Sequence, residues 1–76
     1  MADVVVDTKG MKCPLPVLKA RKALKALPAG GTMEVQATDP GAVKDFEHFC
    51  TTTGAHMLDC RQTPDGVLIF TMKKAS

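Results

Sequence analysis

Apolar and polar positions repeat along the chain with two periods, one typical of strands and one typical of helices. Strand character, shown by β-branched residues or by strict alternation, covers residues 3–7, 32–38, 56–63 and 67–73. Helical character covers residues 14–27 and 40–53. The resulting order, β-α-β-α-β-β, predicts an α/β (α+β) two-layer sandwich, in which a four-stranded mixed sheet carries both helices on one face.

Local signals indicate how these elements should connect. The first two strands should run parallel through a right-handed crossover, and the last two should form a hairpin around Pro64-Asp65-Gly66. The last strand has apolar residues on both faces, which predicts a place inside the sheet. Asp39 should cap the second helix, Pro40 should occupy its first position, and Gly54 should end it.

Length and composition restrict the possible functions. A chain of 76 residues suits one domain spanning residues 1–76, with a small core and no deep substrate cavity. The N-terminus has an acid, Asp3, where a signal peptide carries cations, and no long apolar run follows. The three cysteines lack the paired spacing of a disulfide framework, which fits a reducing compartment. We therefore expect a cytoplasmic protein that does not enter the membrane.

Charge is distributed unevenly, and this asymmetry matters more than the net charge of +2. Residues 8–33 contain six basic residues and no acidic one, whereas the rest of the chain contains four basic and eight acidic residues. The first predicted helix and the segment before it therefore form a basic region, and Cys13 lies inside it.

Cys13 opens the run Cys13-Pro14-Leu15-Pro16 between the first strand and the first helix. A residue that precedes a proline prefers extended backbone angles, which suit a helix N-cap. The N-terminal end of a helix favours a thiolate, so a reactive cysteine is expected here. Pro16 has no N–H, which leaves Leu15 as the only local donor to the sulfur. The alternative is an inert cysteine buried at the strand-helix junction.

The surroundings of Cys13 argue against several other uses of a thiol. A dithiol redox motif would need a second cysteine where Pro16 stands, and a cysteine hydrolase would need a positioned histidine and a cleft. Cys50 should pack in the core, and Cys60 should also point inward, though near a sheet edge. These cysteines and the two histidines lack zinc spacing, so we expect no metal and no cofactor. A lone reactive thiolate suits accepting a group from one protein and yielding it to another.

Three segments together resemble the TusA/SirA-type sulfur-carrier family, and the resemblance covers the whole chain. They are the run from Val6 to Pro16 with its Cys-Pro-x-Pro element, Thr38-Asp39-Pro40-Gly41, and Thr53-Gly54-Ala55-His56. The resemblance implies a sandwich similar to the C-terminal domain of translation initiation factor three, with a persulfide carried on Cys13. Met11, where leucine is commoner, and the extra Cys60 depart from the family pattern without touching this reaction.

The resemblance also implies a sulfurtransferase that acts as a carrier rather than as a high-turnover enzyme. Cys13 would accept sulfane sulfur from a cysteine desulfurase or a rhodanese and pass it to an acceptor sulfurtransferase. The pathway would be tRNA thiolation, molybdenum-cofactor biosynthesis or sulfur oxidation, and the sequence does not distinguish among them. Lys12 and Lys9, close to the helix start, would stabilise the sulfur anion before and after transfer.

The first helix should also present a docking surface near Cys13. At about 100° per residue, one side collects the residues that should face the sheet, which are Val17, Ala20, Ala23, Leu24 and Leu27. The other side collects the cations Lys19, Arg21, Lys22 and Lys25, with Leu15 and Leu18 among them. The residues expected to meet partners are Leu15, Leu18, Lys19, Arg21 and Lys22. Exposed leucines rimmed by cations would favour partners with acidic surfaces. The plainer alternative is a solvated basic face with isolated exposed leucines.

Two other functions stay open on the residues alone. The domain could be a non-catalytic module that binds a protein or an RNA, or it could be a monothiol redox protein. Direct nucleic-acid binding is not expected, because the net charge is modest and aromatic residues for base stacking are nearly absent from exposed positions. We expect a monomer, since the small domain needs no partner to cover its core.

Overall fold

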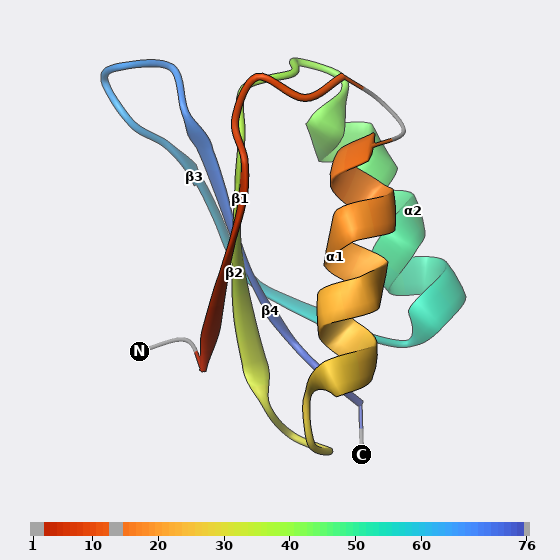
Figure 1. Cartoon of the computed structure of the whole chain (residues 1–76). Coiled ribbons are helices and arrows are strands. Elements are labelled where there is room, and N and C mark those ends of the chain that lie inside the picture. The colour runs from red at the N-terminus through yellow and green to blue at the C-terminus, as the bar shows by residue number, and fades with distance from the viewer. Residues whose placement is uncertain (1–2, 13–14, 76) are drawn as a thin grey trace.

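The structure is a computed structural model that describes residues 3–12 and 15–75. Its strands are β1 (Val4–Thr8), β2 (Thr32–Ala37), β3 (His56–Gln62) and β4 (Leu68–Lys73), and its helices are α1 (Leu15–Ala26) and α2 (Ala42–Thr53). Both helices cover one face of a four-stranded sheet, which makes two layers (Figure 1). The predicted fold class and element order are confirmed.

The sheet has the strand order β1-β2-β4-β3. β1 runs parallel to β2, whereas β4 is antiparallel to both of its neighbours, β2 and β3. Val35 pairs with Val6 on one side and with Phe70 on the other, so apolar side chains line up across the sheet toward the helices. The predictions of a parallel first pair, a terminal hairpin and an interior last strand are therefore confirmed.

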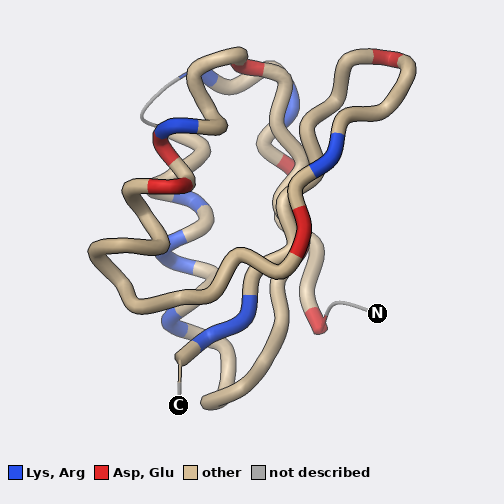
Figure 2. The backbone as a smooth tube through the Cα atoms, turned by 180° about the vertical axis from the view of Figure 1, so that it is seen from behind, with Lys and Arg blue, Asp and Glu red and all other residues tan. Residues whose placement is uncertain are grey.

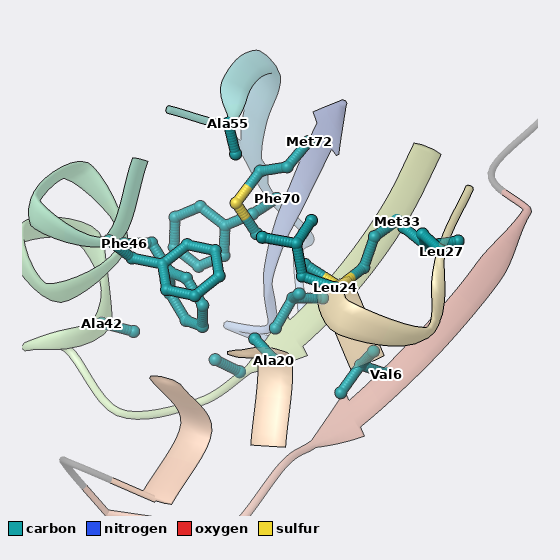
Figure 3. Close-up of a cluster of buried hydrophobic side chains, with 13 residues drawn as sticks. Val6, Ala20, Leu24, Leu27, Met33, Ala42, Phe46, Ala55, Phe70 and Met72 are labelled. Atoms are coloured by element: carbon teal, nitrogen blue, oxygen red, sulfur yellow. The ribbon is translucent and has the colours of Figure 1, made fainter. Parts of the chain in front are cut away.

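The core lies between the sheet and the helices, and aromatic rings fill its centre (Figure 3). Phe46 packs against Phe70 with ring centroids 4.9 Å apart and against Phe49 at 5.8 Å in an edge-on arrangement. Pairs of this kind add stabilisation beyond the apolar area that they bury. α1 adds smaller side chains, Ala20 and Leu24, so the two helices contribute unequally to the core.

β3 departs from the prediction, because most of its residues are exposed. Cys60 pairs with Phe70 in register and therefore shares its face of the sheet, yet the cysteine is exposed. The β3–β4 hairpin projects beyond the helices, and residues 58–62 of β3 are exposed there (Figure 1). The prediction that Cys60 lies in the core is wrong. A register shift between Met57 and Asp59 also leaves Leu58 at the surface.

The start of α2 also differs from the prediction. The helix begins at Ala42, and its N-cap is Gly41, which makes no side-chain cap hydrogen bond. Asp39 is not the cap: its Oδ1 accepts the Gly41 N–H at 3.1 Å, and its carbonyl accepts the Ala42 N–H at 3.0 Å. The carboxylate therefore shapes a turn before the helix, a local pairing typical of aspartate. Gly54, at φ 78°, ends the helix as predicted.

Candidate functional site

The β1–α1 loop, which contains the cysteine motif, emerges where the parallel strands β1 and β2 end. Cys13 and Pro14 lie outside the described residues, and Lys12 and Leu15 flank them on either side. Thr8 and Ala37, the last residues of the two strands, are partners in register, so the loops that follow them leave the sheet side by side. Loops at the carboxyl ends of parallel strands are the usual place for sites in α/β sheets.

Hydrogen bonds hold this loop against the segment that follows β2. The Thr8 side chain is fully buried, and its hydroxyl donates to the Gln36 carbonyl at 2.6 Å. The Met11 N–H donates to the Thr8 carbonyl at 3.1 Å, and the Gly10 N–H donates to the Thr38 hydroxyl at 2.9 Å. Gly10 has a positive φ of 79°, a backbone conformation that residues with a side chain rarely adopt. The backbone that leads to the motif is therefore anchored on both strands.

The entry into α1 is held by a backbone hydrogen bond. The Leu15 N–H donates to the Lys12 carbonyl at 2.9 Å. The expected contact of this N–H with the Cys13 sulfur lies outside the described residues and stays a prediction. Pro16, the other prolyl residue of the motif, is almost fully buried and fixes the first turn against the rest of the domain.

The electrostatic setting of the helix start favours negative charge. α1 runs for 12 residues, so its N-terminal end carries a partial positive charge, and its first turn contains no acidic residue. A thiolate or a persulfide anion held at this end would be stabilised by the helix and by nearby cations. The first turn of α1 therefore adds no negative charge at this end of the helix, and the reactivity of Cys13 stays a prediction.

A surface depression of about 240 Å³ lies beside the motif. Its lining combines the two neighbouring loops, with Gly10, Met11 and Lys12 from one and Thr38, Asp39 and Pro40 from the other. Enclosed small-molecule sites are generally larger, at roughly 300–1,000 Å³. The depression is better suited to part of a protein side chain than to a buried substrate. Sequence reasoning missed the second loop as part of the site, although the parallel β1–β2 pair predicted that the two loops would meet.

The three lysines expected near the site have different surroundings. Lys12 is exposed and lines the depression. The Lys9 ammonium lies 3.9 Å from the Asp7 carboxylate, and the Lys19 ammonium donates to the Asp7 carbonyl at 2.8 Å. Exposed pairs of this kind are weak and leave both lysines able to exchange partners. Of the three, Lys12 is the one that lines the depression beside the motif.

The exposed side of α1 matches the docking surface expected from the sequence. Leu15 and Leu18 are 53% and 55% exposed, and Arg21 and Lys22 are exposed beside them. Figure 2 shows the basic residues spaced along this helix, in contrast to the mixed charges of α2. The exposure of the leucines is confirmed, whereas their role in docking stays a prediction. On the opposite side Ala20, Leu24 and Leu27 are buried, and Val17 and Ala23 pack partly against the core.

The other thiols and histidines form no second centre. Cys50 packs against the core as predicted, and its burial raises the pKa of this thiol above the ordinary value. His48 and His56 are both exposed. Within residues 3–12 and 15–75, no group of histidines, cysteines and carboxylates is arranged to hold a metal, and no helix is long and apolar enough to span a membrane.

Comparison with known proteins identifies the family. The sequence model of the family described as sulfurtransferase TusA matches residues 4–74, which include the motif loop and every element of the sheet. The chain belongs to the TusA family. The sulfur carrier protein TusA of Allochromatium vinosum is 41% identical over 73 residues, which cover 96% of this chain and 95% of that protein. The TusA sulfur carrier of Pseudomonas syringae is 36% identical, with 97% and 87% covered.

A solved structure confirms that the TusA family resemblance extends to the fold. The crystal structure of a SirA-like protein from Desulfitobacterium hafniense superposes on this chain with a TM-score of 0.85 at 26% sequence identity. The superposition covers 96% of this chain and 99% of the other. The predicted family is therefore confirmed by sequence and by structure.

Proposed function

We propose that this chain is a sulfur carrier that receives sulfane sulfur as a persulfide on Cys13 and passes it to a cysteine of an acceptor protein. The observation that carries the proposal is the position of the motif, in an anchored loop that leads into the acid-free first turn of α1. Membership of the TusA family, whose relatives are described as sulfur carriers, supports the same role.

The transfer consists of two exchanges at the same sulfur. The Cys13 thiolate attacks the outer sulfur of a donor persulfide, so that a new S–S bond forms while the donor's S–S bond breaks and releases the donor thiolate. An acceptor thiolate then attacks the outer sulfur now held on Cys13, and the Cys13 thiolate leaves. No net oxidation occurs in either step. The helix start and Lys12 stabilise the anion of Cys13 both as a leaving group and as a nucleophile.

The surface next to the motif is suited to contact with other proteins. The neighbouring depression is small, and Leu15 and Leu18 present apolar surface on the helix that starts at the motif. Donors of the required chemistry are cysteine desulfurases and rhodaneses, and acceptors are sulfurtransferases of tRNA thiolation, molybdenum-cofactor biosynthesis or sulfur oxidation. We place the carrier in the cytoplasm as a monomer, where such exchanges between reduced thiols proceed.

The test is intact mass spectrometry without reductant after incubation with a sulfane donor, either cysteine plus a desulfurase or thiosulfate plus a rhodanese. The wild-type chain should gain the mass of one sulfur atom, and Cys13→Ser should gain none. Cys50→Ser and Cys60→Ser serve as matched controls and should load as the wild type does.

Absence of an adduct with both donors would contradict the proposal and favour a non-catalytic binding module. A glutathione adduct without sulfur loading would likewise contradict it and favour a monothiol redox protein. Sulfur that persists in Cys13→Ser and disappears in Cys60→Ser would place the carrier site on the exposed edge strand instead.

A further inference from the structure

A second surface feature lies on the side of α1 that faces β1. It is a groove of about 510 Å³, lined by residues 4–7 of β1 and by Lys19, Lys22, Ala23 and Ala26 of α1. The α1 residues belong to one flank of the helix, because they repeat at intervals of three and four positions. The groove is separate from the depression at the motif, which is lined by other residues.

One side of this groove is formed by an edge strand. In the part of the chain that the structure describes, β1 pairs with β2 alone, so its opposite edge has no neighbouring strand. Consecutive residues of β1 line the groove, which therefore follows the strand along its length. An unpaired edge presents backbone N–H and C=O groups that an extended segment can pair with. Val5, 55% exposed, adds apolar surface at the same edge.

The α1 wall of the groove combines small side chains with positive charge. Ala23 and Ala26 leave room for the side chains of an added strand, and Lys19 and Lys22 place two ammonium groups along the same wall. The Lys19 ammonium donates to the Asp7 carbonyl at one end of the groove, and neither of the ion pairs found within residues 3–12 and 15–75, Lys9–Asp7 and Arg61–Asp59, involves a cation of α1.

The carboxylates of Asp7, in β1, and of Asp3, just before β1, both accept hydrogen bonds from backbone groups of this chain. Asp7 accepts the Lys9 N–H through Oδ1 at 3.0 Å, and Asp3 accepts the Thr32 N–H through Oδ2 at 2.9 Å. The groove is therefore complementary to an extended segment that carries negative charge on the side facing α1.

We propose that an extended acidic segment of a partner protein binds in this groove as a fifth strand beside β1. Its backbone pairs with the free edge of β1, its carboxylates face α1 and meet Lys19 and Lys22, and its apolar side chains, at the alternate positions, lie beside Val5 on the other face. The inference goes beyond the proposed function, because it does not require sulfur on Cys13. The end of β1 continues into the motif loop, so a strand bound here reaches toward the site of transfer.

The experiment titrates the full, sulfur-free chain with a short blocked peptide in which valine and glutamate alternate, at low ionic strength. Backbone amide resonances of residues 4–8 and 19–26 should shift, and the shifts should weaken as salt is added. A peptide of the same sequence with alternate backbone nitrogens methylated should bind at least about tenfold more weakly, since it cannot complete the strand pairing. Shifts confined to β3, or equal binding of the methylated peptide, would overturn the proposal.

Two charge-reversal variants distinguish binding in the groove from nonspecific electrostatic attraction to α1. Lys22→Glu should raise the Kd of the Val-Glu peptide about fivefold, because Lys22 lines the groove. Lys25→Glu changes the charge equally on the same helix outside the groove and should raise the Kd by less than about twofold. Equal effects of the two variants would overturn the proposal, as would equal affinity for a peptide of alternating valine and lysine.

Discussion

The two helices have the same length of 12 residues and cover the same face of the sheet, yet they differ in what they contribute. α2 supplies Phe46 and Phe49, two of the largest fully buried side chains, and its charges are mixed. α1 buries smaller residues, keeps Leu15 and Leu18 exposed, and carries only positive charge.

This difference indicates a division of labour between the helices. Aromatic burial on α2 fixes the sandwich, so α1 is free to place apolar and basic side chains at the surface beside the motif. Substitutions on the buried side of α2 should therefore change stability, whereas substitutions on the outer side of α1 should change recognition.

The largest effect is expected from Phe46→Ala, which removes a ring in contact with two other aromatic residues. The free energy of unfolding should fall by about 3–5 kcal/mol, a large share of the stability of a domain of this size. Chemical denaturation measures the change, and Leu18→Ala on α1 is the control, with an expected change within about 0.5 kcal/mol. Equal losses in the two variants would contradict the division of labour.

Sulfur transfer to the acceptor protein should slow when the exposed leucines of α1 are made polar. In the double variant Leu15→Ser and Leu18→Ser, sulfur transfer to the acceptor protein should slow about tenfold, since apolar anchors dominate interface energies. The stability should change little, as both side chains are exposed. The control is His48→Ser, at an exposed position of α2, and its transfer rate should match that of the wild type. A rate unaffected by the double variant would refute the docking role.

A smaller effect is expected at the hydrogen bond below the motif loop. Thr8→Val removes the buried hydroxyl that donates to the Gln36 carbonyl and should cost about 1–2 kcal/mol of unfolding free energy. Thr51→Val on α2 removes an exposed hydroxyl that donates to the Glu47 carbonyl, with an expected cost below about 0.5 kcal/mol. If Thr8→Val were as mild as Thr51→Val in chemical denaturation, the loop anchor would not stabilise the domain as described.

The smallest effect concerns the thiol on α2. Burial raises the pKa of Cys50, so the folded chain keeps this proton to a higher pH than the unfolded chain does. Above the unfolded pKa the unfolded state therefore loses the proton first, and stability declines as the pH rises. In a Cys13→Ser background at mildly alkaline pH, Cys50 should be alkylated at least about threefold more slowly than the exposed Cys60. Faster alkylation of Cys50 would contradict its partly buried position.

Most of the fold could be predicted from the sequence because hydrophobic period, turn residues and crossover handedness all favour one topology. The exposure of Leu15 and Leu18 followed from helical spacing alone. The exposure of Cys60 did not, because alternation assigns a residue to a face of the sheet but does not say how far the helices cover that face. The role of Asp39 depended on backbone angles in the turn before α2, which a capping signal does not determine.

The central claim is that Cys13 is the residue that carries sulfur, and peptide mapping tests it most directly. Trypsin cleavage after lysines and arginines places Cys13 in a peptide of residues 13–19, and Cys50 and Cys60 together in a peptide of residues 45–61. After loading from a desulfurase and alkylation without reductant, the extra sulfur should be found on the peptide of residues 13–19. Sulfur found on the peptide of residues 45–61, or on neither peptide, would contradict the claim.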